Sequence, residues 1–182
     1  MRQVATLLCI AFFTAGCATS GSPSLYTLDM SPSDAAGSPV NISVGRLRIT
    51  EALQNKRILI KKSPTEVEYY AAAQWAAGLD EMLAQKLALE FGPSDPARDT
   101  FILSGVLLAF EQVDAPAGGE AHVRLAVELR PEGASHYSKP ALAKTYDLRR
   151  PASSSTAGGV VESLSDCLEQ VAREIVADVA AL

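Results

Sequence analysis

Residues 121–130, AHVRLAVELR, decide the fold class, because apolar and polar side chains alternate along them more regularly than anywhere else in the chain. The aliphatic members of this stretch are Val123, Leu125, Val127 and Leu129. A period of two is the pattern of a β-strand with one buried face and one solvated face. The stretch therefore predicts a sheet that needs an apolar layer against one side, and we interpret His122 as a histidine on the solvated side.

Four other stretches have the composition of strands. Apolar and polar residues alternate over 40–49, where Gly45 predicts a kink. Residues 57–62 (RILIKK) contain three consecutive aliphatic residues, 100–111 form a long aliphatic run, and 142–148 are a further candidate. The two continuous runs indicate strands that are buried on both faces over part of their length.

Residues 63–70 carry conflicting signals. Ser63, Pro64 and Glu66 match the start of a helix, with a capping serine, a proline in the first turn and a glutamate at the third position. The same residues fit a hairpin turn that leads into a strand over 66–70 equally well. Local chemistry leaves both alternatives open.

Two stretches have helical periodicity. From about Ala73, apolar residues recur at helical spacing, polar residues such as Lys86 fill the positions between them, and Gly92 ends the pattern. Near the carboxyl terminus, apolar residues recur by threes and fours over about 20 residues. Four apolar residues of these helices are expected in the structural core: Trp75, Leu79, Leu164 and Leu168. Strands, a helix, three more strands and a closing helix predict a single α/β domain.

Groups that could catalyse a reaction are few. We interpret both histidines, His122 and His136, as solvated surface residues. No serine lies in a G-x-S-x-G elbow, and no His/Cys pair has the spacing of metal ligands. Gly158-Gly159 opens a helix but lacks the lysine of a phosphate-binding loop. The sequence therefore predicts no catalytic residue, no metal site and no cofactor.

The amino terminus has the pattern of a bacterial lipoprotein signal. Arg2 precedes the apolar residues 4–16, and Ala15-Gly16 leads directly into Cys17. As a helix these 13 residues reach roughly 20 Å, which is too short for a hydrocarbon core of about 30 Å. A cysteine at this point supplies a thiol that a lipid donor can alkylate. The alternative is an ordinary secretory signal with a chance cysteine.

The expected organisation follows from that signal. Residues 1–16 are the signal peptide, 17–39 are a flexible tether with Cys17 as the lipid attachment (palmitate or a similar acyl chain) and a short strand at 26–28, and 40–182 are the domain. Cys167 then remains as a lone thiol, which we interpret as a small buried apolar residue. The 182 residues carry 16 basic and 21 acidic side chains, a balance that argues against nucleic acid as a partner.

The chain resembles the ABC-type transport auxiliary lipoproteins of the PqiC/YmbA kind. The resemblance rests on the lipidated cysteine, the helix pattern and a set of short motifs. These motifs are Tyr26-Thr27-Leu28, residues 44–47 (VGRL), 57–60 (RILI) and 67–70 (VEYY), and Gln74-Trp75-Ala76.

The resemblance implies a three-layer α/β domain, with a mixed sheet between two main helices, similar to the anticodon-binding or TolB amino-terminal fold. It also implies a strand over 66–70. The family works with MCE-type lipid transport systems, so the implied partners are a periplasmic MCE protein and an ABC permease and ATPase, and a homo-oligomer is compatible with it. The implied role is non-enzymatic, on the periplasmic face of the outer membrane, through a lipid anchor. The alternatives are a lipoprotein that carries an apolar ligand and an envelope hydrolase.

Overall fold

The computed structural model describes residues 22–31, 40–115 and 118–182. The signal peptide, Cys17 and most of the expected tether lie outside these residues. Within them the helices are η1 (a 3-10 turn, Glu51–Gln54), α1 (Leu79–Phe91) and α2 (Ala157–Ala180). The strands are β1 (Ser24–Tyr26), β2 (Asn41–Ile49), β3 (Arg57–Lys61), β4 (Val67–Trp75), β5 (Thr100–Ala115), β6 (Gly118–Pro131) and β7 (Leu142–Pro151).

These strands form one mixed sheet around the long strand β5. β6 pairs antiparallel with one edge of β5, and β7 pairs antiparallel with β6. On the other edge, β2 and β3 lie end to end, both parallel to β5: Asn41 lies opposite Thr100, and Leu59 opposite Glu111. η1 lies in the segment that connects β2 to β3. β4 pairs antiparallel with β3, and β1 pairs parallel with the end of β4.

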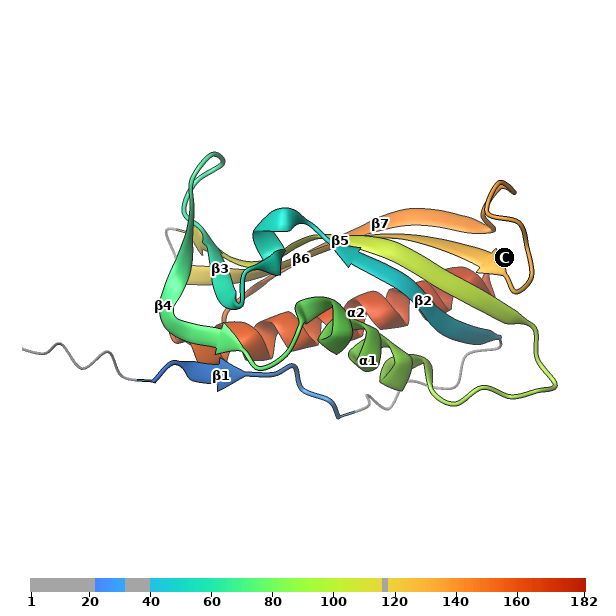
Figure 1. Cartoon of the computed structure of the whole chain (residues 1–182), viewed down its shortest axis with the longest axis horizontal. Helices are drawn as coiled ribbons and strands as arrows, with labels where there is room; N and C mark the ends of the chain where they lie inside the picture. The colour runs from blue at the N-terminus through green and yellow to red at the C-terminus, as the bar shows by residue number, and fades with distance from the viewer. Residues whose placement is uncertain (1–21, 32–39, 116–117) are drawn as a thin grey trace, which may run out of the picture.

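Both helices cover the same face of the sheet (Figure 1). α2 packs on β5, β6 and β7, α1 packs on β2, and the two helices contact each other. The aliphatic side of 121–130 faces this layer, where Val123, Leu125 and Leu129 are fully buried. The expected α/β class, with a mixed sheet and two main helices in one domain, is confirmed.

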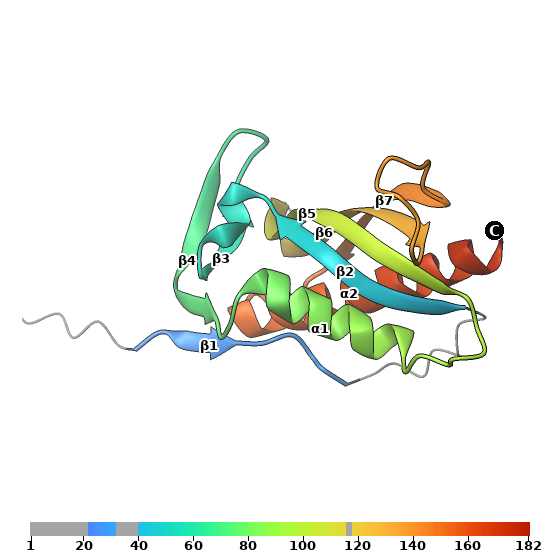
Figure 2. The ribbon, with the colours of Figure 1, turned by 45° about the vertical axis from the view of Figure 1, so that its right-hand side comes forward.

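The layers are arranged differently from the expected sheet between helices. β4 bulges between Tyr69 and Gln74, and its curved end carries β1 to the far side of the helix layer, so that the helices lie between the central strands of the sheet and the segment 22–31 (Figures 1 and 2). Each helix buries its apolar side against the inner face of the sheet. The opposite face of the sheet is not covered by any described helix.

The first helix begins later than its periodicity indicates. Trp75 is the last residue of β4, Gly78 caps α1, and the helix starts at Leu79 rather than near Ala73. Trp75 N donates to Lys56 O at 2.7 Å, and Tyr26 of β1 lies opposite on the other edge. Because strand partners on both edges satisfy this backbone, strand pairing outweighs the high helix propensity of the alanines in 71–77.

The conflict at 63–70 is resolved as a hairpin. Glu66 O accepts hydrogen bonds from Lys62 N and Ser63 N, at 3.0 and 3.3 Å, and β4 follows from Val67. The amino-terminal strand lies at Ser24–Tyr26 rather than 26–28. Beyond it Leu28 is 1% exposed, so its side chain belongs to the core without being in a strand.

Candidate functional site

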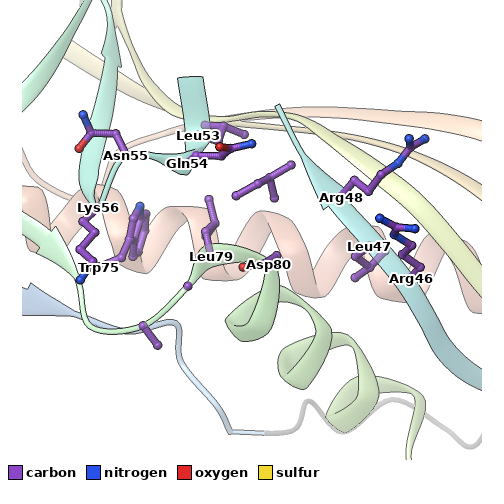
Figure 3. A pocket seen from close by; sticks show the side chains of 13 residues that line it. Arg46, Leu47, Arg48, Leu53, Gln54, Asn55, Lys56, Trp75, Leu79 and Asp80 are labelled. Atoms are coloured by element: carbon purple, nitrogen blue, oxygen red, sulfur yellow. The ribbon is translucent and has the colours of Figure 1, made fainter. Parts of the chain in front are cut away.

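A hollow of about 520 Å³ opens where β2, η1 and the β4–α1 junction meet (Figure 3). We call it the Trp75 hollow. Its volume is within the range of small-ligand sites. It exists because β2 and β3 are separate strands on one edge of β5, and the detour through η1 leaves a gap that Trp75 and the start of α1 close from below.

The floor of the Trp75 hollow is apolar and buried. Leu53, Trp75 and Leu79 line it, and each is at most 4% exposed. The Trp75 ring packs against Phe110 with ring centroids 5.6 Å apart and the planes tilted by 50°, a favourable aromatic arrangement. Such a floor offers a firm surface but little apolar area to a ligand.

The rim is cationic. Arg46 and Arg48 of β2 and Lys56 line it, with Asp80 as the acid among the lining residues. Among the residues that the structure describes, neither arginine forms an ion pair, and both are exposed. The rim therefore concentrates positive charge on a chain whose formal net charge is −5.

A β-bulge sets the direction of these two arginines. Val44 pairs with Leu103, but the register then shifts, and Leu47 pairs with Gly105. Without the extra residue, Arg46 would follow Val44 onto the buried face; with it, Leu47 takes that face and both arginines face solvent. Gly45 permits the bulge, because a Cβ there would lie 2.8 Å from Ile102 Cγ2.

Arg46 and Arg48 also line a second hollow, of about 700 Å³, on the face of the sheet that the helices leave uncovered. This open-face hollow crosses β2, β5, β6 and β7, and His136 lines it from the β6–β7 loop. Its other cations are paired: Arg130 Nη1 lies 2.6 Å from Glu128 Oε2, and Lys144 Nζ lies 2.6 Å from Asp178 Oδ2. The two β2 arginines are thus shared by both hollows and available to a partner.

His122 differs from its sequence interpretation, since it is only 6% exposed. Its Nδ1 lies 3.1 Å from Oε1 of the buried Glu111, and its Nε2 lies 2.9 Å from Asp147 Oδ1. Alternation places His122 on the polar face but cannot show that a carboxylate from each neighbouring strand covers it. Because both ring nitrogens are occupied, His122 has none left to activate a nucleophile.

Other signs of an active centre are absent from the described part of the chain. No group of three or more His, Cys, Asp or Glu residues there could hold a metal ion. Cys167 is buried, and burial raises the pKa of its thiol, which disfavours the reactive thiolate. His136 is exposed, as interpreted.

The structure places the four expected core residues together under the sheet. Trp75 and Leu79 meet at the hollow's floor, and Leu164 and Leu168 are fully buried on α2. Cys17, the expected lipid attachment, lies outside the described residues. The arginine rim was missed, although its one local signal, Gly45 inside an alternating strand, did predict an irregularity.

The fold and its two hollows define a single-domain α/β protein with an open, cationic surface on one side of its sheet. No helix in the described part of the chain is long and apolar enough to cross a membrane. The chain belongs to the family of ABC-type transport auxiliary lipoprotein components, whose model matches residues 26–176.

Solved structures have the same fold. The chain is similar to protein XCC0632 from Xanthomonas campestris, described as a DUF330 protein, with a TM-score of 0.71 and 22% identity over 87% of this chain and 95% of that one. A second structure, of an uncharacterized protein, has a TM-score of 0.65 and 14% identity over 87% and 99% of the two chains. No curated protein matches the sequence.

Proposed function

We propose that this chain is a non-enzymatic lipoprotein, held to the periplasmic face of the outer membrane by acyl groups on Cys17, that docks an MCE-type ABC lipid transport system and so contributes to envelope integrity. The observation that carries the proposal is the family match, which begins at residue 26, nine residues after the cysteine of a lipoprotein signal. In this proposal residues 1–16 are removed and 17–182 form the mature protein. In this proposal the ABC transport system carries out the transport, and this domain provides the protein contacts that dock it.

The rim of the Trp75 hollow is the contact surface that we assign to the periplasmic MCE partner. Arginine is favoured at the centres of protein interfaces, and complementary charge speeds encounter and fixes orientation. Arg46 and Arg48 line the rim above a buried apolar floor, and neither forms an ion pair with another described residue. An acidic, partly apolar segment of the partner fits this combination.

The test is a pull-down of the mature protein with the periplasmic MCE subunit of the proposed transport system. We expect wild type to capture this subunit and the Arg46→Glu/Arg48→Glu double variant to lose it. The matched control is Lys61→Glu/Lys139→Glu, which makes the same change of charge at two lysines outside the ion pairs of the described residues. No capture by wild type would contradict the docking function, whereas equal capture by both double variants would contradict only the assigned surface.

Carriage of an apolar ligand is the alternative function, and the structure favours it less. The Trp75 hollow has the volume of a ligand site, but its floor residues are already buried, so an acyl chain would gain little contact there. Mass spectrometry of the purified mature protein distinguishes the two functions. Retained lipid would favour a carrier, and its absence is expected for a docking protein.

A further inference from the structure

The amino-terminal segment 22–31 is bound to the body along its length. β1 pairs with the end of β4, and Tyr26 O accepts a hydrogen bond of 2.8 Å from Ala76 N. Leu28 is buried at 1% exposure, and Asp29 N donates to Ser165 Oγ of α2 at 3.1 Å. The segment therefore combines strand pairing, apolar burial and a helix contact within a few residues.

A buried lysine holds the far end of this segment. Lys86 of α1 is 0% exposed, and its Nζ donates to Ser31 O at 2.7 Å. The same atom lies 2.8 Å from Glu90 Oε1 and 2.8 Å from Glu169 Oε1. Because an ammonium has three donors, the Ser31 carbonyl completes the set that the two carboxylates leave unfilled. Leaving the helices would cost the segment this charge-assisted hydrogen bond.

Docking of the segment sets how far the body can move from an anchor at Cys17. Residue 17 is five residues from Ser22, a stretch that spans at most about 18 Å. If 22–31 were free, the chain from residue 17 to the start of β2 at Asn41 would span up to about 80 Å. The bound segment therefore reduces the reach of the anchor about four- to fivefold.

We propose that the docked segment 22–31 orients the body on the bilayer, so that the end of the molecule at which β1 begins faces the membrane. This proposal rests on the lipid anchor of the proposed function. α2 starts beside β1, where Gly158 lies next to the Tyr26 ring, and its 24 residues carry the chain about 36 Å to the opposite end (Figures 1 and 2). The β1 end is the membrane-facing surface, and the carboxyl-terminal end of α2 points away from the bilayer.

Leu25 fits the same orientation. It lies in β1, eight residues from Cys17, and it is a large apolar side chain that is 64% exposed. On the surface of a bilayer such a side chain can enter the interface, which offsets its exposure to water. At the opposite end, the exposed loop between β6 and β7 has Tyr137 as its one large apolar side chain over 132–139, and most of its other residues are polar or small.

The experiment attaches the chain from Cys17 onward to vesicles through a maleimide lipid, so that the anchor does not depend on acylation in cells. A fluorophore is placed by an unnatural amino acid at Ala72, next to β1, or at Leu182, at the end of α2. The vesicles carry a lipid-bound quencher. We expect stronger quenching at Ala72 than at Leu182, and equal quenching at both sites would overturn the proposal.

Two variants test whether docking causes this difference. Leu28→Ser should release the segment and abolish the difference, whereas Leu89→Ser, the same substitution at a leucine of α1 that is 42% exposed, should retain it. Circular dichroism establishes that each variant is folded. If Leu28→Ser fails to fold, an insertion of about 12 Gly/Ser residues after residue 21 replaces it, because it adds roughly 20 Å of reach and alters no described residue.

With the insertion we expect the difference to decrease strongly. A difference that is unchanged by both Leu28→Ser and the insertion would overturn the proposal. Failure of acylation at Cys17 in cells would contradict the proposed function and leave this vesicle measurement unaffected. The two conclusions are therefore separable.

Discussion

At the scale of single residues, Lys86 illustrates what burial does to a charged side chain. Burial of the ammonium acts to lower its pKa, but hydrogen bonds to Glu169 and Glu90 outweigh burial and raise the pKa above its ordinary value. Periodicity places Lys86 between the apolar positions of a helix, where a lysine normally reaches solvent. It is buried because the two glutamates and the Ser31 carbonyl together satisfy its donors.

Truncation of the Trp75 side chain should lower the stability of the fold. We expect Trp75→Ala to lower the free energy of unfolding by about 3–5 kcal/mol, because it leaves a cavity beside Phe110 under the hollow. Denaturant unfolding measures this loss. Leu108→Ala is the control, since Leu108 is 39% exposed and should cost much less. Equal losses in the two variants would contradict a core role for Trp75.

At the scale of elements, an electrostatic contact joins the end of α2 to β7. Asp178 Oδ2 lies 2.6 Å from Lys144 Nζ and accepts a hydrogen bond of 2.6 Å from the Tyr146 hydroxyl. Hydrogen bonds from Lys144 and then Tyr146 hold the pKa of Asp178 below its ordinary value of 3.8. The contact fastens the last turns of the helix to the outer strand of the sheet.

The stability from this contact should depend on pH in a defined direction. Because the pKa of Asp178 is lowered by folding, its contribution is present above pH 3.8 and is lost as the pH falls through the folded value. We expect Asp178→Asn to be less stable than wild type at neutral pH, with a difference that shrinks in acid. Thermal unfolding across pH measures it, with the exposed Asp99→Asn as control. A constant difference across pH would contradict the assignment.

At the scale of the whole molecule, the helices cover only one face of the sheet, so the two faces can serve different roles. The helices and the segment 22–31 lie on one side of the sheet, and the open-face hollow with its arginines lies on the other. In the proposed function, the first side carries the chain towards its anchor and the second remains accessible to a partner.

The anchor itself is tested by Cys17→Ala. We expect this variant to lose membrane fractionation and labelling by a fatty acid analogue in cells, because the thiol that accepts the lipid is gone. Cys167→Ala is the control, since that thiol is buried in the core. Labelling that persists in Cys17→Ala would contradict the lipoprotein assignment.

Side-chain periodicity by itself determined the α/β class, the strand at 121–130 and the last helix, because each buries one face along a continuous stretch and that pattern is local. Family motifs added the expectation of a strand at 66–70, which the hairpin at 63–66 agrees with. The buried positions Leu164 and Leu168 could be predicted from the sequence because they belong to the periodic apolar face of the last helix.

Only the tertiary structure decided which polar residues are buried and where the site lies. Trp75 ends a strand because β1 and Lys56 pair with it, and His122 is buried because Glu111 and Asp147 cover it from neighbouring strands. The arginines of β2 reach the surface because one bulge shifts the register. Each of these outcomes depends on partners distant in the chain, and residue spacing along one stretch contains no information about partners that only folding brings into contact.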